Sequence, residues 1–307
     1  MVGDFNGDSW PDVLILDDSE PGRARGIRND RGRPVRFDLD PDLLRCEGAR
    51  LLHVLDYDLD QDLDIVCRFS DGYHALRNDG AFAFYDEGRI DGYGSTSGIT
   101  DKSSATVPDL DNDGREELIG FGGLDGRTRC NVVVQSRAGR LEVQPCGTVF
   151  AGGWSSDCAG RMTGDVYDYD NDGDLDLVGV ANASCSRSSA RLMRNDTGGI
   201  YRSLRVRVKG LDGNPGCMGC RLELREGGTL VAQRSMQMRN SFTHSRLNVV
   251  GHLGAGTRAQ VDLIIIPPSD RRAPVTFPAV RTGQTVVVDL SPATPTLTEH
   301  WRPGTGF

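Results

Sequence analysis

Four short acidic stretches recur along this 307-residue chain, and they constrain its fold more than any other feature. Each stretch has nine residues, with carboxylate or amide side chains at positions 1, 3, 5 and 9. The stretches, which we call loops 1 to 4, are Asp4–Asp12 (DFNGDSWPD), Asp56–Asp64 (DYDLDQDLD), Asp109–Glu117 (DLDNDGREE) and Asp168–Asp176 (DYDNDGDLD). Aspartate favours turns over helices, so four such stretches in register indicate repeated turns rather than helices.

Short β-prone runs surround the loops. Runs follow the loops at Val13–Leu16, Ile65–Val66, Leu118–Ile119 and Leu177–Val178, and precede three of them at Leu51–Leu55, Ala105–Val107 and Met162–Tyr167. A second run ending in Arg-Asn-Asp recurs at Ile27–Asp30, Leu76–Asp79 and Met193–Asp196, with Val133–Ser136 in its place in the third unit. Asn-Asp after a β-prone run is typical of a turn. Units of about 40–50 residues with about four strands are typical of propeller blades. We therefore expect an all-β fold with a partial β-propeller of about four blades.

Charge divides the chain into two parts. Residues 1–200 hold 37 acidic and 21 basic residues, whereas residues 201–307 hold 7 and 14. This break predicts propeller blades over 1–200, a small antiparallel β domain over 201–290, and a flexible Pro- and Thr-rich tail over 291–307. The net charge of −9 argues against nucleic acid as the main partner. No apolar run is long enough to cross a membrane.

The loops carry the chemistry of a calcium site. Alternate oxygen-bearing side chains of a tight loop can converge on one point, and position 7 can add its backbone carbonyl. Five or more hard oxygen donors suit Ca²⁺ better than Mg²⁺, and the loops contain no Cys or His for zinc. The candidate ligands are Asp4, Asn6, Asp8, Trp10, Asp12, Asp56, Asp58, Asp60, Asp62, Asp64, Asp109, Asp111, Asp113, Arg115, Glu117, Asp168, Asp170, Asp172, Asp174 and Asp176.

Two other interpretations of the loops fit the sequence less well. An EF-hand needs Glu at loop position 12, where this chain has Ile15, Cys67, Gly120 and Gly179. A solvated acidic turn would explain one loop. However, two like charges about 4 Å apart repel by roughly 4 kcal/mol at an effective dielectric near 20. Four such clusters between strands therefore favour bound cations, with loop 1 the weakest because little sequence precedes it.

These motifs resemble FG-GAP/VCBS-type repeats, as in integrin α-chain propellers. The resemblance rests on the D-x-[DN]-x-D-x-x-x-[DE] loops and the Arg-Asn-Asp turns, and it implies calcium bound between the first two strands of each blade. Residues 204–290 resemble an ASPIC/UnbV domain through Leu204–Val208, Gly213-Asn214, Gly216–Arg221, Gly251–Gly254 and Val261–Ser269. Both together resemble the cartilage acidic protein family, which implies a secreted, calcium-binding protein. Because related propellers have more blades, we expect an N-terminally truncated chain.

Eight cysteines and two sequons bear on the compartment. Cys46/Cys67, Cys130/Cys146 and Cys158/Cys185 are the local pairs that the spacing suggests, although eight cysteines allow 105 pairings. Cys217 and Cys220 favour a small local disulfide over a redox or zinc site. Asn182 and Asn195 head glycosylation sequons. With calcium sites, these features favour a secreted, extracellular protein.

The predicted function is a non-catalytic extracellular interaction or matrix-associated module in which Ca²⁺ stabilises the blades. The partner is expected to be an extracellular protein or a glycan. Two alternatives stay open. A glycan-binding module would use exposed aromatics such as Trp10, Trp154 and Tyr93, and a propeller-based carbohydrate-active enzyme would need a residue cluster outside the loops. No catalytic triad or isolated acid/base pair stands out in the sequence, so no catalytic residue is assigned.

Overall fold

The computed structural model describes residues 2–15, 25–38, 46, 49, 51–69, 72–90, 105–106, 108–124, 127–135, 140–146, 150, 155–156, 160–183, 189–196, 201–210, 214–236, 250–268 and 272–300. These residues form strands and turns, and none of them lies in an α-helix. The all-β prediction is confirmed. Within this described portion, no helix could span a membrane.

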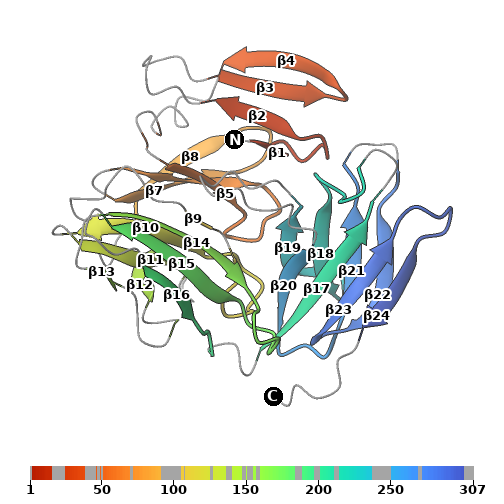
Figure 1. The fold of residues 1–307 in the computed structure, drawn as a ribbon. Helices are drawn as coiled ribbons and strands as arrows, with labels where there is room; N and C mark the ends of the chain where they lie inside the picture. Colours follow the sequence, from red (N-terminus) through yellow and green to blue (C-terminus); the bar gives the residue numbers. More distant parts are fainter. Residues whose placement is uncertain are drawn as a thin grey trace.

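Four sheets follow one another along the first 200 residues (Figure 1). The first sheet comprises β1 (Val2–Gly3), β2 (Asp12–Ile15), β3 (Arg25–Asp30) and β4 (Arg33–Asp38). The second comprises β5 (Leu51–Leu55), β6 (Asp64–Arg68), β7 (Tyr73–Asn78) and β8 (Phe84–Arg89). The third comprises β9 (Ala105–Thr106), β10 (Leu118–Leu124), β11 (Arg127–Gln135), β12 (Leu141–Pro145) and β13 (Ser155–Ser156), and the fourth comprises β14 (Gly160–Tyr167), β15 (Asp176–Ala183) and β16 (Ser189–Met193). Each acidic loop joins the first two strands of its sheet.

The four sheets pack in sequence order through apolar clusters. Leu14 of the first sheet and Ile65 of the second share one buried cluster. Val66 of the second sheet and Leu118 of the third share another, and the third and fourth sheets meet in a cluster that contains Ile119 and Leu177. Successive side chains of a strand point to opposite faces, so neighbouring residues such as Ile65 and Val66 serve the two junctions of one sheet.

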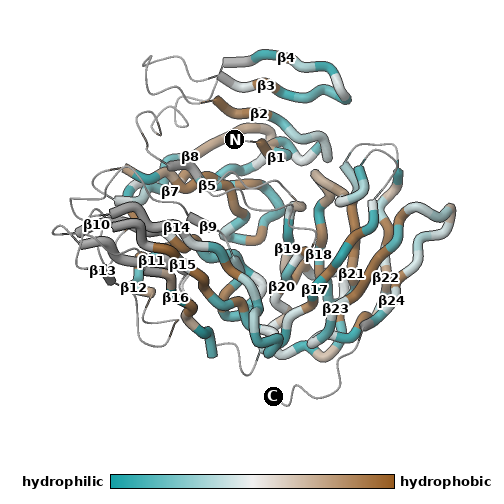
Figure 2. The backbone as a smooth tube through the Cα atoms, in the orientation of Figure 1, coloured by the Kyte–Doolittle hydropathy of each residue, from teal (hydrophilic) through white to brown (hydrophobic). Residues whose placement is uncertain are grey.

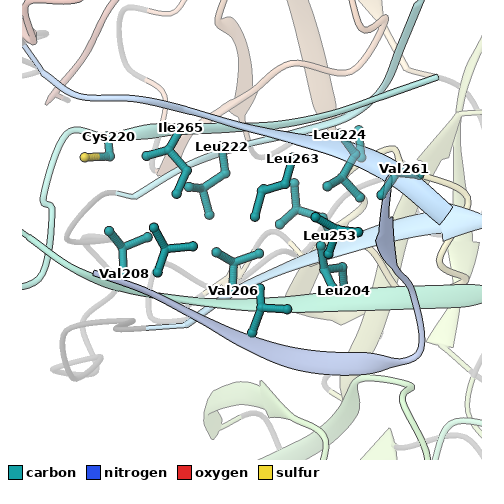
Figure 3. Close-up of a cluster of buried hydrophobic side chains, with 14 of the residues drawn as sticks. Leu204, Val206, Val208, Cys220, Leu222, Leu224, Leu253, Val261, Leu263 and Ile265 are labelled. Atoms are coloured by element: carbon teal, nitrogen blue, oxygen red, sulfur yellow. The ribbon is translucent and has the colours of Figure 1, made fainter. Parts of the chain in front are cut away.

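The C-terminal part is a sandwich of two four-stranded sheets. One has the order β20 (Val250–Gly256), β17 (Arg202–Lys209), β23 (Gln284–Asp289), β24 (Thr296–His300), and the other β19 (Thr229–Ser235), β18 (Arg221–Glu226), β21 (Gln260–Ile266), β22 (Val275–Arg281). Figure 3 shows residues such as Val206 and Leu263 meeting between the sheets. Burial alternates along β21, as expected for a strand with one face in a core.

Two features of this domain differ from the sequence-based expectation. β17 and β23 pair in parallel, so the domain is not wholly antiparallel. Residues 296–300, assigned to a flexible tail, form β24 against β23, with Leu297 packed on the core. The alternating sequence Thr296-Leu297-Thr298 supplies that strand, and the neighbouring prolines obscured it. Figure 2 shows the apolar stretches within the strands, whereas the β3–β4 hairpin is mostly hydrophilic.

The described cysteines are disulfide-bonded. Cys46 pairs with Cys67, and Cys217 pairs with Cys220, as the spacing suggested. Cys146 is disulfide-bonded, and the pairing of Asn131 with Pro145 places Cys130 beside it on the neighbouring strand, although the Cys130 side chain lies outside the described set. Cys158 and Cys185 also lie outside the described residues.

Candidate metal-binding loops

All four loops adopt one backbone conformation. Positions 4 and 6 have positive φ in each, a conformation that glycine and asparagine tolerate best. Gly7, Asn112 and Asn171 fill position 4 of loops 1, 3 and 4, and Gly114 and Gly173 fill position 6 of loops 3 and 4. Loop 2 instead has Leu59 at φ 62° and Gln61 at φ 84°. The repeated turn brings positions 1, 3 and 9 toward one another.

The carboxylate at position 9 closes each loop. In loop 2, Asp64 accepts the Tyr57 N–H at 3.1 Å and the Asn78 N–H at 2.8 Å. Asp12 and Asp176 make the equivalent pairs in loops 1 and 4. In loop 3, which lacks the Arg-Asn-Asp turn, the longer Glu117 accepts the Leu110 N–H at 2.7 Å. In loops 1, 2 and 4, position 9 therefore ties the loop to the end of the third strand of its sheet, whereas the Glu117 bond lies within loop 3.

In each of loops 2, 3 and 4, three acidic side chains of that loop come close together. In each group, every residue offers a carboxylate oxygen, and these oxygens all lie within 4.8 Å of one another. The groups are Asp56, Asp58 and Asp64 in loop 2, Asp109, Asp111 and Glu117 in loop 3, and Asp168, Asp170 and Asp176 in loop 4. These clusters could hold a metal ion, as the spacing of positions 1, 3 and 9 predicts.

The position 1 residue of each cluster has a buried oxygen without a partner. Asp56, Asp109 and Asp168 are 2–4% exposed, and the Oδ1 atom of each makes no hydrogen bond in the structure. Their Oδ2 atoms are engaged, for example by the Gln61 N–H on Asp56 at 3.1 Å. A buried polar atom without a partner costs about 1–3 kcal/mol, and more when charged. The same cost recurs at position 1 of three loops, and a cation bound at that oxygen would remove it.

Burial and mutual repulsion raise the pKa values of these carboxyls. Loss of hydration, followed by the charges of Asp60 and Asp58, raises the pKa of Asp56 to about 7. Burial raises the pKa of Asp64 to about 9 and that of Asp176 to about 6. The pKa values of Asp109 and Glu117 are also raised, chiefly by burial and then by neighbouring carboxylates. A cation bound between the oxygens would reverse each of these effects.

Loop 1 differs from the other three. Position 3 is Asn6, whose amide oxygen accepts the Asp8 N–H at 3.2 Å. Asp4 is only partly buried, and both of its oxygens accept backbone N–H groups, from Asp8 and Ser9. Among the described residues, loop 1 forms no group of three converging acidic side chains.

Positions 5 and 7 are linked within every loop. The position 5 carboxylate accepts the position 7 N–H at 2.8–2.9 Å. The pairs are Asp8 with Trp10, Asp60 with Asp62, Asp113 with Arg115, and Asp172 with Asp174. These bonds shape the turn, and a ligand role for positions 5 and 7 stays a prediction.

The asparagine of the Arg-Asn-Asp turn joins adjacent sheets, a role that sequence reasoning missed. Asn78 Nδ2 donates to the Phe5 carbonyl at 3.0 Å and to the Leu63 carbonyl at 3.2 Å, which links loop 1 to loop 2. Asn195 Nδ2 donates in the same way to Leu110 and Leu175, which links loop 3 to loop 4. The recurrence of Asn at the same place in three units was the available signal.

This geometry corrects one glycosylation prediction. Asn195 is 0% exposed and its amide nitrogen, the atom that would carry the glycan, donates two hydrogen bonds inside the protein. The folded chain has no room for a sugar there. Asn182 lies in β15, and its side chain is outside the described set.

The C-terminal sandwich contacts loops 2 to 4 directly. The Gly254 N–H donates to Asp109 Oδ2 at 2.8 Å, and a Cβ at Gly254 would overlap that oxygen and the Asn112 backbone. Arg205 Nη1 donates to Asp168 Oδ2 at 2.6 Å, and Arg225 Nη2 donates to the Gln61 side chain at 2.9 Å. Residues from the sandwich thus contact the position 1 carboxylates of two clusters.

Asn112 is the centre of the contact at loop 3. Its Nδ2 donates to Asp174 of loop 4 at 2.7 Å, and its Oδ1 accepts from His252 Nε2 at 2.8 Å. Burial, followed by the charges of Arg234 and Arg205, lowers the pKa of His252 to about 3. His252 is therefore a neutral donor that fixes loop 3 against β20.

The residues proposed for glycan stacking are only partly described. Trp10 is partly buried in loop 1, and Trp154 and Tyr93 lie outside the described residues. Glycan binding and catalysis stay predictions.

Comparison with known proteins does not assign the chain to a family. No protein-family model and no curated protein matches it. A solved lectin from Agrocybe aegerita, described as recognising non-reducing terminal N-acetylglucosamine, is 14% identical with a TM-score of 0.43, over 91% of this chain and 84% of the lectin. The PQQ-bound aldose sugar dehydrogenase of Streptomyces coelicolor is 11% identical with a TM-score of 0.23, over 81% and 97%. Likenesses this weak assign neither fold details nor function.

Proposed function

We propose that this chain is a calcium-stabilised, non-catalytic extracellular interaction module. Its N-terminal sheets would be FG-GAP/VCBS-type blades of a partial propeller, and its sandwich would be an ASPIC/UnbV-like domain. The observation that carries the proposal is the repeated buried oxygen at position 1, which lacks a hydrogen-bond partner in Asp56, Asp109 and Asp168. Each of these oxygens belongs to a cluster of three carboxylates.

Calcium fits these clusters better than the common alternatives. The donors are carboxylate oxygens throughout, which excludes the nitrogen and sulfur environment that zinc prefers. Three carboxylates from one short loop, with further oxygens available at positions 5 and 7, suit the flexible six- to eight-fold coordination of Ca²⁺. Mg²⁺ prefers fewer protein ligands and keeps more water.

The role of the ion is structural. Each cluster lies at the end of a sheet, beside residues that join that sheet to its neighbour or to the sandwich. A cation in loop 3 would neutralise Asp109, which holds both the Gly114 N–H and the Gly254 N–H. Bound calcium would thereby stabilise the local turn and the contact between the two parts of the chain at once.

The disulfides support an extracellular setting for this module. The N-terminal part holds the disulfide Cys46–Cys67, and the C-terminal sandwich holds Cys217–Cys220. Disulfides persist in oxidising compartments. Extracellular calcium sites also work at millimolar calcium, where a modest affinity is sufficient. The module would then present its surface to an extracellular protein or glycan.

Calorimetric titration of the full chain, first treated with a chelator, tests the proposal. We expect three calcium binding events, one for each of loops 2 to 4, and a higher melting temperature with calcium. Asp58→Asn should remove or strongly weaken one event, because it keeps the turn acceptor and loses the charge. Asp30→Asn, an exposed residue outside the loops, is the control. A chain that takes up no calcium and melts at the same temperature with EGTA would overturn the proposal.

A further inference from the structure

The strands that follow the acidic loops pack in a repeating register. When the loop numbering is continued into the strand that follows, positions 10 and 11 are the first two residues after each loop. At each of the three junctions between sheets, position 11 of one sheet shares a buried cluster with position 10 of the next sheet. The pairs are Leu14 with Ile65, Val66 with Leu118, and Ile119 with Leu177, and all six residues are at most 1% exposed. Each sheet therefore has an outgoing face, which carries position 11, and an incoming face, which carries position 10.

Within the described residues, the stack of four sheets ends in one partly exposed face of each kind. On the fourth sheet, position 11 is Val178, which is 42% exposed beside Val180 and Leu192. On the first sheet, position 10 is Val13, which pairs with the exposed Val2 across the β1–β2 ladder, and Ile15 at position 12 is 45% exposed. The outgoing face (Val178, Val180, Leu192) and the incoming face (Val2, Val13, Ile15) are both aliphatic.

We propose that the outgoing face of one copy docks on the incoming face of a second copy, head to tail. Such a contact would repeat the junction that the chain already uses three times, with Val178 of one copy in the place that Ile119 occupies against Leu177. Two sheets usually pack face to face through aliphatic side chains of this kind. The proposal rests on the packing of apolar strand faces and uses none of the carboxylates of the clusters, so it stands independently of the metal assignment.

Charge favours head-to-tail docking over docking of like faces. Asp165 pairs with Val178 on the outgoing face and is exposed. Arg36 pairs with Ile27, next to Val13, on the incoming face and is also exposed. In head-to-tail docking, β14 with Asp165 would stack on β1, and Arg36 would lie three strands away on β4, so the two residues give the two faces opposite charge without forming an ion pair. Docking of outgoing on outgoing would instead bury a carboxylate from both copies in one contact. A head-to-tail contact leaves one face open on each outer copy, so it extends to larger assemblies or closes into a ring.

Sedimentation of the full chain in calcium tests this inference. We expect the average mass of the wild type to rise above that of a monomer by about 100 μM, a concentration at which a contact with a Kd of about 1 μM is largely occupied. Val178→Lys and Ile15→Lys should each weaken self-association at least about tenfold, because each buries an unpaired charge in the contact. Val250→Lys, which alters another partly exposed valine on a strand of the sandwich, is the matched control and should behave as the wild type.

Mixing the two variants identifies the geometry. Val178→Lys keeps a working incoming face and Ile15→Lys keeps a working outgoing face, so their equimolar mixture should form a 1:1 dimer and nothing larger. Circular dichroism checks that each variant remains folded. A wild type that stays monomeric, a face variant that associates as well as the control, or a mixture of folded variants that stays monomeric would overturn the inference.

Discussion

Arg205 of the sandwich donates a 2.6 Å hydrogen bond to Asp168, the first residue of loop 4. The pair is mostly buried, with the Asp168 side chain 2% exposed, and Arg205 lowers the pKa that burial raises. In loop 4, the positive charge of Arg205 therefore already lies at Oδ2 of Asp168, next to Oδ1 of the same carboxylate, which has no hydrogen-bond partner. In loop 3, the corresponding oxygen of Asp109 accepts two backbone N–H groups, from Gly114 and Gly254, and no charged donor.

This difference predicts that Arg205 weakens calcium binding in loop 4. Arg205→Gln keeps a hydrogen-bond donor and removes the charge, so calcium affinity at one site should rise about five- to tenfold, the equivalent of about 1 kcal/mol. Calorimetric titration measures the change. Arg207→Gln, an exposed residue on the same strand, should leave all affinities unchanged. A loss of affinity in Arg205→Gln would show that the arginine supports the site instead.

Gly254 should be required for docking of the sandwich on loop 3. Gly254→Ala places a Cβ where Asp109 Oδ2 and the Asn112 backbone lie, so loop 3 must shift. We expect about 2 kcal/mol of destabilisation and weaker calcium binding at one site, measured by urea denaturation and calorimetry. Gly216→Ala has only the Met218 sulfur near its Cβ, at 4.0 Å, and serves as control. Equal stability of the two variants would contradict the direct contact.

Asn195 should contribute to the junction between the third and fourth sheets. Asn195→Asp has the same shape but replaces the Nδ2 donor with an oxygen that faces the Leu110 and Leu175 carbonyls. Loss of both bonds and the resulting buried acceptors should cost about 2–4 kcal/mol of unfolding free energy. Asp196→Asn changes an exposed neighbour and should cost little. Denaturant unfolding of both variants at equal calcium decides whether Asn195 has this role.

Loop 2 should gain stability from a better residue at position 4. Leu59 has φ 62°, and a left-handed conformation costs roughly 1–2 kcal/mol for an ordinary residue but less for asparagine. Leu59→Asn reproduces the residue found at this position in loops 3 and 4, so we expect about 1 kcal/mol of stabilisation in chelator. An unchanged or lower unfolding free energy would mean that the Leu59 side chain compensates for its backbone.

The metal-free chain should lose stability as pH rises toward neutrality. Burial raises the pKa of Asp56 to about 7 and those of Asp12 and Asp176 to about 6, from the ordinary aspartate value of 3.8. Between about pH 4 and pH 7, the folded chain therefore binds more protons than the unfolded chain, and unfolding free energy falls with increasing pH. Thermal melts in EGTA at about pH 5 and about pH 7.5 measure this slope. With saturating calcium, which binds the deprotonated carboxylates, we expect the slope to reverse.

The sequence allowed the local parts of this structure to be predicted, because local rules determine them. The run Leu51–Leu55 is a strand as its β-prone composition suggested, and the periodic carboxylates of Asp56, Asp58 and Asp64 meet as their spacing predicted. The parallel pairing of β17 with β23 depends on how segments about 80 residues apart meet, which no local pattern contains. The roles of His252 and Asn195 likewise depend on loops from distant parts of the chain.

Anomalous X-ray diffraction from crystals grown in calcium tests the central claim most directly. The account predicts one anomalous peak in each of loops 2, 3 and 4, about 2.3–2.6 Å from several carboxylate oxygens. One of these oxygens should be Oδ1 of Asp56, Asp109 or Asp168, the atoms that lack a hydrogen-bond partner. An ordered structure at high calcium without peaks, and with these oxygens turned toward solvent, would contradict it.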